Sequence, residues 1–337
     1  MKHKLISLAE RGEWQTALED TLHTPVHTWE YCRAMTETSK LDSFLFVAET
    51  SGGKVVCPVN VRQKCCGYPE LVSPYGFGGF GATSMATIGS KGFVDCWDFF
   101  CHENGFITAY IMQHPAIPLS ESIWGPNLHN HHALYLLDLR RSEEMLLRCM
   151  AKTHRYEIRR LLKTKENALV VERSCLRAGL VHLYPETIDR VNASSTYSFC
   201  KDTLESLAEM PGTVMFGVEE GGEIVAVTVF ICTSVFGDYF LNASTHSGRK
   251  YTRLLVWSTI LELKRRGVTW LNLGGGVQQA DSLENFKRRF GGRKVLGQVL
   301  KQVLDREKYA YLMGKYGAVG HSEREYFPPY WATGSAD

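Results

Sequence analysis

The stretch Trp270–Gly292 contains the strongest candidate for chemistry, a lysine presented close to the end of a predicted strand. The apolar run Trp270–Leu273 leads into Gly274–Gly276, and three glycines allow left-handed backbone angles and the close approach of another group. A short helix follows, with Asp281–Ser282 as its cap, and Lys287 lies on it. The alternative is a cationic surface helix, since charged runs usually face water, and spacing alone leaves both interpretations open.

Two aromatic residues on the same short helix determine how it is anchored. Phe286 and Phe290 are four residues apart, so both face the core from one side of the helix. Gly291–Gly292 end the segment. This pattern predicts a rigidly packed helix that presents Lys287 beside its apolar anchor.

A second candidate is a pair of arginines on a predicted helix over residues 152–163. Arg155 and Arg159 are four residues apart and project together, beside an apolar face. One interpretation is a clamp for a phosphate-bearing ligand, and the other is a solvated basic face. The distribution of charge favours an anionic ligand in this half of the chain. The first 137 residues contain 9 basic and 13 acidic residues, and the remainder contains 29 and 23.

The segment LNLGGG…DSLENFKRRFGG resembles the C-terminal signature of the FemAB-like branch of the GNAT acyltransferase superfamily. Members typically show a glycine pair after a strand, then Phe-Lys before a second aromatic residue and glycine. The closing YFPPYW over residues 326–331 is similar to the tail of that family. The resemblance covers most of the chain and is strongest from about Ala151 onward. It implies an α/β (α+β) fold of two tandem GNAT-like domains, with mixed sheets flanked by helices.

The resemblance also implies an activity. A FemAB-type N-acyltransferase forms an amide on an amino group of a cell-envelope, polysaccharide or similar small-molecule precursor, which can be lipid-linked. Acyl transfer to an amine requires a neutral nucleophile, aligned reactants and a stabilised oxyanion. Lys287 is the implied catalytic residue, stabilising the oxyanion or the carbonyl of the donor. The residues expected to bind the acceptor substrate are Arg155, Arg159, Tyr75, Gly76, Phe286, Gly274 and Gly275.

The acyl donor is expected to bind near His246, Gly248, Arg249 and Lys250. In the GNAT superfamily the matching loop binds the pyrophosphate of acyl-CoA. Here the loop has one glycine and two cations, without the usual spacing of small residues, which favours aminoacyl-tRNA as donor and makes tRNA a partner. The donor is then a co-substrate, and no permanently bound cofactor is expected. An acyl-CoA-dependent GNAT N-acetyltransferase is the first alternative, and a non-catalytic precursor-binding module is the second.

Other candidate residues leave alternatives open. The loop around Tyr75 and Gly76 is rich in glycine and aromatic residues, which suits either an acceptor pocket or an aromatic plug between the two halves. For the general base, the candidates are Asp238, Asp281 and His246, although each type is common in turns and caps. The histidines at 129, 131 and 132 are expected in a surface loop without metal, because no further ligand spacing accompanies them.

Composition excludes several classes of protein. The 337 residues are 44% hydrophobic and 22% charged, as in soluble globular proteins, with no apolar run near the ~20 residues of a membrane helix. Acidic residues interrupt the N-terminal stretch that a signal peptide would require, so we expect a cytoplasmic protein. Ten cysteines without CxxC spacing predict reduced thiols. The net charge of +2 does not indicate DNA binding.

The domain organisation is predicted from an internal duplication. FLFVAETSGGKVVCPVNV and VMFGVEEGGEIVAVTVF share an aromatic strand, an acidic step, a Gly-Gly turn and a β-branched strand. This predicts a β-hairpin in each of two similar domains, residues 1–135 and 136–337. In the second half, helices are predicted from Ser142 onward through 163, near 187–191, over 201–209 and over 252–266.

Overall fold

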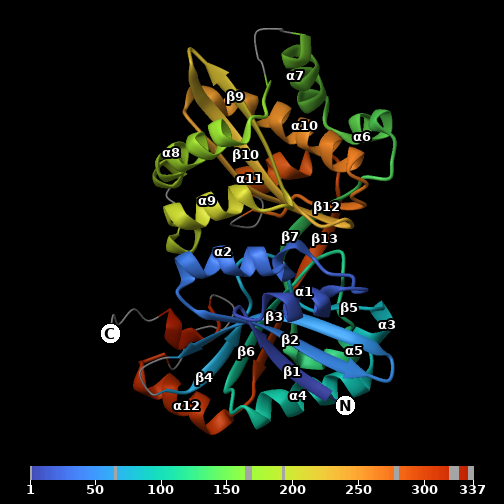
Figure 1. Ribbon diagram of the computed structural model, residues 1–337, viewed down its shortest axis with the longest axis vertical. Coiled ribbons are helices and arrows are strands. Elements are labelled where there is room, and N and C mark those ends of the chain that lie inside the picture. The colour runs from blue at the N-terminus through green and yellow to red at the C-terminus, as the bar shows by residue number, and fades with distance from the viewer. Residues whose placement is uncertain are drawn as a thin grey trace. The chain divides into compact units, whose positions relative to one another are not determined.

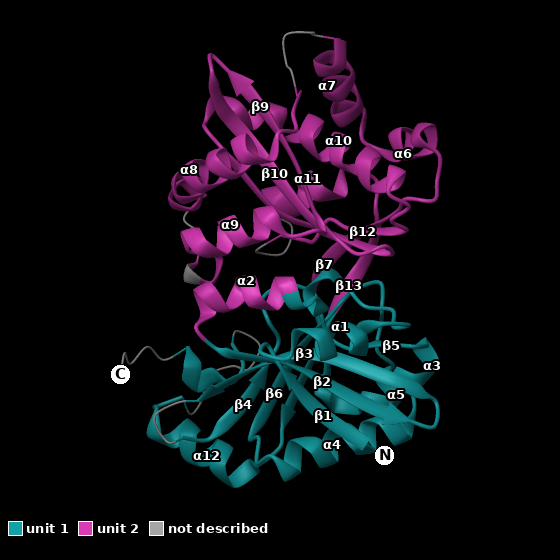
Figure 2. Ribbon diagram, in the orientation of Figure 1, with its two compact units in different colours: residues 1–29, 41–131, 298–337 teal, residues 30–40, 132–297 magenta. Residues whose placement is uncertain are grey.

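The computed structural model describes residues 2–63, 67–163, 169–191, 194–276, 281–318 and 326–332. The predicted mixed α/β fold class is confirmed, and the chain forms two compact units (Figure 2). Unit 1 comprises residues 1–29, 41–131 and 298–337, and unit 2 comprises residues 30–40 and 132–297. The main division lies close to the expected one at residue 135. Two segments differ from the expected contiguous domains: residues 30–40 belong to unit 2, and residues 298–337 belong to unit 1.

Unit 2 contains one half of the mixed sheet, with its strands in the order β7-β12-β11-β10-β9-β8. Strands β11 and β12 are parallel, and the other pairs with a described register are antiparallel. The strands are β7 (Leu128–Asp138, entering from unit 1), β8 (Leu169–Val170), β9 (Thr213–Glu220), β10 (Glu223–Cys232), β11 (Phe236–Ser244) and β12 (Trp270–Asn272).

Helices cover both faces of this sheet. Gly217 and Val218 are neighbours on β9 and therefore point to opposite faces. A side chain at Gly217 would collide with Leu176 of α8, whereas Val218 packs with Leu254 of α10. Helices α8 and α9 thus lie on one face and α10 on the other (Figure 1). The helices of unit 2 are α2 (Trp29–Ser39, whose first residue belongs to unit 1), α6 (Glu143–Cys149), α7 (Lys152–Lys163), α8 (Arg173–Val191), α9 (Lys201–Glu209), α10 (Thr252–Arg265) and α11 (Ser282–Arg288).

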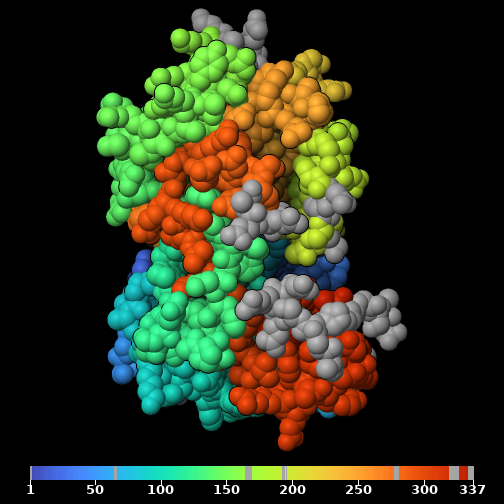
Figure 3. Space-filling model, turned by 180° about the vertical axis from the view of Figure 1, so that it is seen from behind, coloured from blue at the N-terminus to red at the C-terminus, as the bar shows by residue number. Residues whose placement is uncertain are grey.

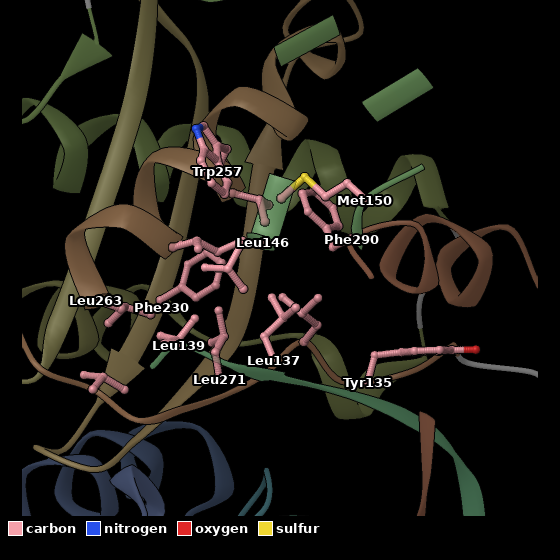
Figure 4. Close-up of a cluster of buried hydrophobic side chains, with 14 of the residues drawn as sticks. Tyr135, Leu137, Leu139, Leu146, Met150, Phe230, Trp257, Leu263, Leu271 and Phe290 are labelled. Atoms are coloured by element: carbon pink, nitrogen blue, oxygen red, sulfur yellow. The ribbon is translucent and has the colours of Figure 1, made fainter. Parts of the chain in front are cut away.

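A hydrophobic cluster joins the sheet of unit 2 to α6, to α10 and to Phe290, which lies two residues beyond the end of α11 (Figure 4). Leu137 and Leu271 are cross-strand partners on β7 and β12, and both are buried in it with Phe290. The side chain of Tyr135 lies at the edge of the cluster, and its hydroxyl points away from the aliphatic residues (Figure 4). The core therefore holds the β12 end and the α11 segment against the same layer.

Unit 1 contains strands in the order β1-β2-β3-β4-β6-β13, with β5 paired to β3. An aromatic core forms where Trp97 of α4 packs between Phe46 and Phe80, with ring centroids 5.1 Å from each. The strands are β1 (Lys2–Ser7), β2 (Asp42–Thr50), β3 (Gly53–Gln63), β4 (Pro69–Val72), β5 (Gly81–Ala82), β6 (Thr108–Gln113) and β13 (Arg293–Val303, entering from unit 2). The helices are α1 (Arg11–Leu18), α3 (Met85–Ile88), α4 (Lys91–Glu103), α5 (Glu121–Trp124) and α12 (Arg306–Lys315).

The C-terminal tail belongs to unit 1. The Glu70 carboxylate is fully buried and accepts hydrogen bonds from the Tyr330 hydroxyl at 2.5 Å and from Trp331 Nε1 at 2.8 Å. Arg62 pairs with the same carboxylate at 3.1 Å and lies over the Trp331 ring. A buried carboxylate with this many partners makes the tail part of the unit 1 core.

Both predicted hairpins are confirmed. β2 pairs with β3 in unit 1, and β9 pairs with β10 in unit 2. In the second hairpin Gly221 and Gly222 both have positive φ angles, 63° and 86°, as a two-residue hairpin turn between right-twisted strands requires.

Three element predictions are wrong in part. The helix expected near 187–191 begins at Arg173, and the helix expected from Ser142 through 163 breaks at Met150. The histidines at 129, 131 and 132, expected in a surface loop, lie in β7, which begins at Leu128. The polar run at the start of β7 lacks the apolar alternation that identifies a half-buried strand. Among the helices formed by the described residues, none has the length and apolar character of a membrane span.

Candidate functional site

Lys287 lies on α11 beside the end of β12, as the sequence predicts. Asp281 caps the helix, accepting a hydrogen bond from the Glu284 amide at 2.7 Å. From α11 the Lys287 Nζ reaches back and donates a hydrogen bond to the Gly275 carbonyl at 2.8 Å. The ammonium also lies 5.5 Å from the centroid of the Tyr239 ring on β11, in the range of a cation–π contact. The lysine is therefore held at a strand end by a carbonyl and an aromatic ring.

The surroundings of the ammonium lower its pKa. Burial disfavours the charged form and lowers the pKa of Lys287 to about 8, although the Asp281 charge acts in the opposite direction. Within the described part of the chain, no carboxylate forms an ion pair with Lys287. At neutral pH the side chain is mostly a desolvated cation, which is the form that stabilises an oxyanion.

The glycines after β12 allow the lysine to approach. Gly274 has a φ of 71°, and a Cβ at this position would lie 2.9 Å from the Lys287 Nζ. A Cβ on Gly275 would lie 2.1 Å from the Ala133 carbonyl oxygen of β7. The predicted close approach is confirmed, and the groups that approach are Lys287 and a neighbouring strand. Roles of Gly274 and Gly275 in substrate binding remain predictions.

A buried polar network that sequence reasoning did not assemble surrounds this turn. The Asn272 side chain donates to Asp238 Oδ1 at 2.9 Å and accepts from the Gly274 amide at 2.8 Å. The Gly274 carbonyl accepts from the amide of Tyr135 at 3.1 Å. Both backbone groups of Gly274 are therefore engaged. Asparagine ahead of a glycine run is a usable turn signal, whereas the pairing with Asp238 depends on strand register.

A second buried pair adjoins the site. The Tyr135 hydroxyl donates to Glu284 Oε1 at 2.9 Å, and both residues are buried. Burial, with the Glu284 carboxylate as a smaller cause, raises the pKa of Tyr135 above its usual value. Glu284 and Lys287 are three residues apart on α11, so both face the same side of the helix. The pair connects α11 directly to β7.

The aromatic anchors of α11 pack as predicted. Phe290 is fully buried and Phe286 half-buried, and the His154 ring of α7 lies 4.7 Å and 5.4 Å from them. Burial, assisted by the charge of Arg253, lowers the pKa of His154 to about 4, so the ring is neutral at pH 7. Phe286 serves as packing here, and its role in substrate binding remains a prediction.

Helix α7 carries the two predicted arginines, and its N-terminal end adjoins the α11 segment. The amide of Ala151, just before α7, donates to the Arg289 carbonyl at 2.9 Å, and Figure 3 shows the green α7 region beside the orange-red α11 region. Arg159 is exposed, and Arg155 is half-buried and donates to the Arg148 carbonyl at 3.3 Å. Binding of phosphate by these two side chains is not tested by the geometry and remains a prediction.

The predicted donor loop forms a 3₁₀ turn, Ser247–Tyr251, between β11 and α10. Gly248 is buried against β10, where a Cβ would lie 2.0 Å from the Val225 carbonyl oxygen. Lys250 pairs with Glu220 at 2.9 Å. His246 and Arg249 are exposed. Six residues of β11 follow Asp238, which corresponds to roughly 20 Å of strand between the Asn272 level and this loop.

Tyr75 and Gly76, which are predicted to bind the acceptor, belong to unit 1, and both are half-buried. In that unit, Gln113 fixes the following part of the loop, because its side chain accepts from the Phe80 amide at 2.8 Å and donates to the Phe80 carbonyl at 3.1 Å. Acceptor binding by Tyr75 and Gly76 therefore stays a prediction.

The three candidates for the general base lie in different surroundings. Asp281 is the helix cap, Asp238 is buried and bonded to Asn272, and His246 is exposed at the donor loop. The residues at 129, 131 and 132 lie within β7 rather than in a loop. Searching the described residues finds no group of three or more His, Cys, Asp or Glu side chains that could hold a metal ion.

Comparison with known proteins gives fold relationships. The sequence matches no protein-family model, and no curated protein matches it. FemX has a similar structure, with a TM-score of 0.68 and 11% identity over 92% of this chain and 99% of the FemX chain. The C-terminal domain of a candidate lysylphosphatidylglycerol synthetase from Agrobacterium fabrum has a TM-score of 0.58 and 14% identity, covering 93% and 98%. L-PGS from Bacillus licheniformis has a TM-score of 0.57 and 13% identity, covering 88% and 92%. The chain therefore shares the fold of FemX and of these two proteins.

Proposed function

We propose that this protein is a FemAB-type N-acyltransferase, which moves an aminoacyl group from aminoacyl-tRNA to an amino group. The acceptor is a cell-envelope, polysaccharide or similar small-molecule precursor. The observation that carries the proposal is the Lys287 ammonium, held 2.8 Å from the Gly275 carbonyl at the end of β12. A partly desolvated cation can stabilise the charge that develops on the carbonyl oxygen of the donor more strongly than the ground state.

The chemical step is nucleophilic attack by a neutral acceptor amine on the ester carbonyl of the donor. A tetrahedral oxyanion forms, the bond to the tRNA ribose oxygen breaks, and the proton that the amine loses passes to that oxygen, so the products are the amide and tRNA with a free ribose hydroxyl. Lys287 stabilises the oxyanion in this proposal. The exposed cation Arg249 is available for the phosphates of the donor. Arg155 and Arg159 serve a phosphate-bearing acceptor.

The test supplies three donors and two kinds of acceptor. The donors are tRNAs charged with ¹⁴C-amino acids, the same tRNAs after RNase treatment, and ¹⁴C-acetyl-CoA. The acceptors are nucleotide-linked amino sugars and muropeptides, and vesicles containing phosphatidylglycerol. We expect RNase-sensitive transfer of label to an amine. Transfer from acetyl-CoA alone would instead support the CoA-dependent N-acetyltransferase. Label in phosphatidylglycerol, which has hydroxyl groups and no amine, would contradict an amine acceptor.

Binding without transfer would support the third possibility, a non-catalytic precursor-binding module. Calorimetric titration with the same nucleotide-linked acceptors measures binding, and the transfer assay measures release of uncharged tRNA. A binding module would bind an acceptor in the first experiment and release no uncharged tRNA in the second. The transferase predicts both binding and release of uncharged tRNA in step with amide formation. Lys264 is the matched control for Lys287, because its side chain also donates to a backbone carbonyl, that of Leu139, at 3.0 Å.

A further inference from the structure

The end of β12 contains hydrogen bonds that the proposed chemistry does not use. Asp238 and Asn272 are direct cross-strand partners on the parallel strands β11 and β12, so their side chains lie on the same face of the sheet. Both are buried, with 5% and 1% of their surfaces exposed, and they bond to each other at 2.9 Å. Burying polar side chains is costly unless they are hydrogen-bonded, and the bond between these two offsets part of that cost.

Lys287 lies on the other face of the same strands. Tyr239 follows Asp238 in β11 and therefore points to the opposite face, where it stacks on Phe230 with ring centroids 4.8 Å apart. The Lys287 ammonium lies over this Tyr239 ring. The Asp238–Asn272 pair and the ammonium are thus separated by the backbone of the sheet and share no side-chain contact among the described residues.

The backbone of Gly274 and Gly275 connects the two faces. Asn272 Oδ1 accepts from the Gly274 amide at 2.8 Å, and the carbonyl of the following residue, Gly275, accepts from the Lys287 Nζ at 2.8 Å. Gly274 has a φ of 71°, a left-handed backbone conformation that glycine adopts without strain. Glycine adopts other backbone conformations as easily, so the residue type alone does not fix the turn. Hydrogen bonds select one conformation of such a turn: the Tyr135 amide holds the Gly274 carbonyl, and the Asn272 side chain holds the Gly274 amide.

We propose that Asn272, held in orientation by Asp238, is a positioning residue for Lys287. Its side chain fixes the Gly274 turn, which aims the Gly275 carbonyl at the ammonium. Asp238 acts on Asn272 by accepting from the amide nitrogen, which leaves the amide oxygen facing Gly274. The inference rests on the proposed function only where kinetics are concerned, since the position of Lys287 can be measured without any substrate.

The experiment measures the pKa of Lys287 by trace labelling with acetic anhydride across pH, with mass spectrometry of the peptide that carries it. Wild type should give a midpoint of about 8. In Asn272→Ala the carbonyl is no longer fixed, the ammonium moves to water, and the midpoint should rise toward the about 10.4 of an exposed lysine. Asn242→Ala is the control, because Asn242 lies on the same strand as Asp238 and its side chain binds only Thr228 among the described residues, at 2.9 Å.

A second pair of variants separates positioning from a general loss of structure. Asp238→Ala should shift the Lys287 midpoint in the same direction, and Asp238→Asn, which retains an Oδ1 acceptor, should restore it. With an active donor, Asn272→Ala should lower kcat about tenfold with little change in KM. A Lys287 midpoint that stays at the wild-type value in folded Asn272→Ala and Asp238→Ala would overturn the inference. Absence of transfer by wild type would contradict the proposed function and leave the labelling result unaffected.

Discussion

The titration of a single lysine should control how activity depends on pH. In the proposed mechanism the protonated form of Lys287 is the active one. Its pKa is lowered to about 8, so turnover should be highest below this value and fall as pH rises through it. In Lys287→Arg the guanidinium stays charged throughout, so the remaining activity should lack this descending limb. The measurement is kcat from pH 6 to 10. An equal decline of kcat with rising pH in wild type and Lys287→Arg would show that another group causes the descending limb.

The same desolvated ammonium should reduce the stability of the fold. The folded pKa of about 8 lies below the unfolded value of about 10.4, so the unfolded chain binds more protons between those two pH values. Stability should therefore rise with pH across that window. At pH 7 we expect Lys287→Met to increase the free energy of unfolding by about 1 kcal/mol, as functional residues often oppose stability.

Urea unfolding at pH 7 checks this prediction, with Lys264→Met as the matched control. Lys264 also donates to a carbonyl, at 3.0 Å, so its replacement should leave stability unchanged or lower it. A less stable Lys287→Met protein would show that the ammonium contributes favourably where it lies.

At the scale of elements, Phe290 should anchor α11 more strongly than Phe286 does. Phe290 is 1% exposed and belongs to the main core of unit 2, whereas Phe286 is half-buried beside it. Phe290→Ala should therefore cost about 3–5 kcal/mol of unfolding free energy, and Phe286→Ala roughly half as much. Chemical denaturation of the two variants measures the difference, and the reverse ranking would contradict the packing described here.

Helix α7 should contribute to ligand binding more than to folding. Replacing Arg155 and Arg159 together by Ala should raise KM for a phosphate-bearing acceptor about tenfold, with a stability change below about 1 kcal/mol. The control is the double change of Arg265 and Arg266 to Ala, which removes two arginines that pair with Glu262 on α10. Equal effects of the two double variants on KM would make α7 an ordinary solvated helix face.

The local parts of the site could be predicted from sequence. The cap at Asp281, the glycine turn and the aromatic anchors depend on residues within a few positions of one another. The Asp238–Asn272 bond joins residues 34 positions apart, and only the register of β11 and β12 brings them together. Much of α8 escaped prediction because Gly179 and Pro185, which normally interrupt helices, both lie inside it.

At the scale of the molecule, the predicted domains differ from the compact units in a way that can be tested. Unit 1 includes residues 298–337, so a fragment of residues 1–135 lacks Tyr330, a partner of the buried Glu70. It also lacks Gln302, which accepts from Trp97 Nε1 at 2.7 Å. We expect the fragment to show no cooperative thermal unfolding by circular dichroism, unlike the full chain. A cooperative transition of the fragment would instead support the predicted contiguous domain of residues 1–135.

The turnover of Lys287→Ala tests the central claim most directly. Lys287→Ala, Lys264→Ala and wild type are compared with the ¹⁴C-aminoacyl-tRNA donor and an amine acceptor that wild type uses, at pH 7. Loss of one oxyanion donor costs ~3–4 kcal/mol, so kcat of Lys287→Ala should fall by about two to three orders of magnitude while the protein stays folded. Lys264→Ala should keep wild-type turnover. A folded Lys287→Ala protein with kcat within about threefold of wild type would contradict the proposed role of this lysine.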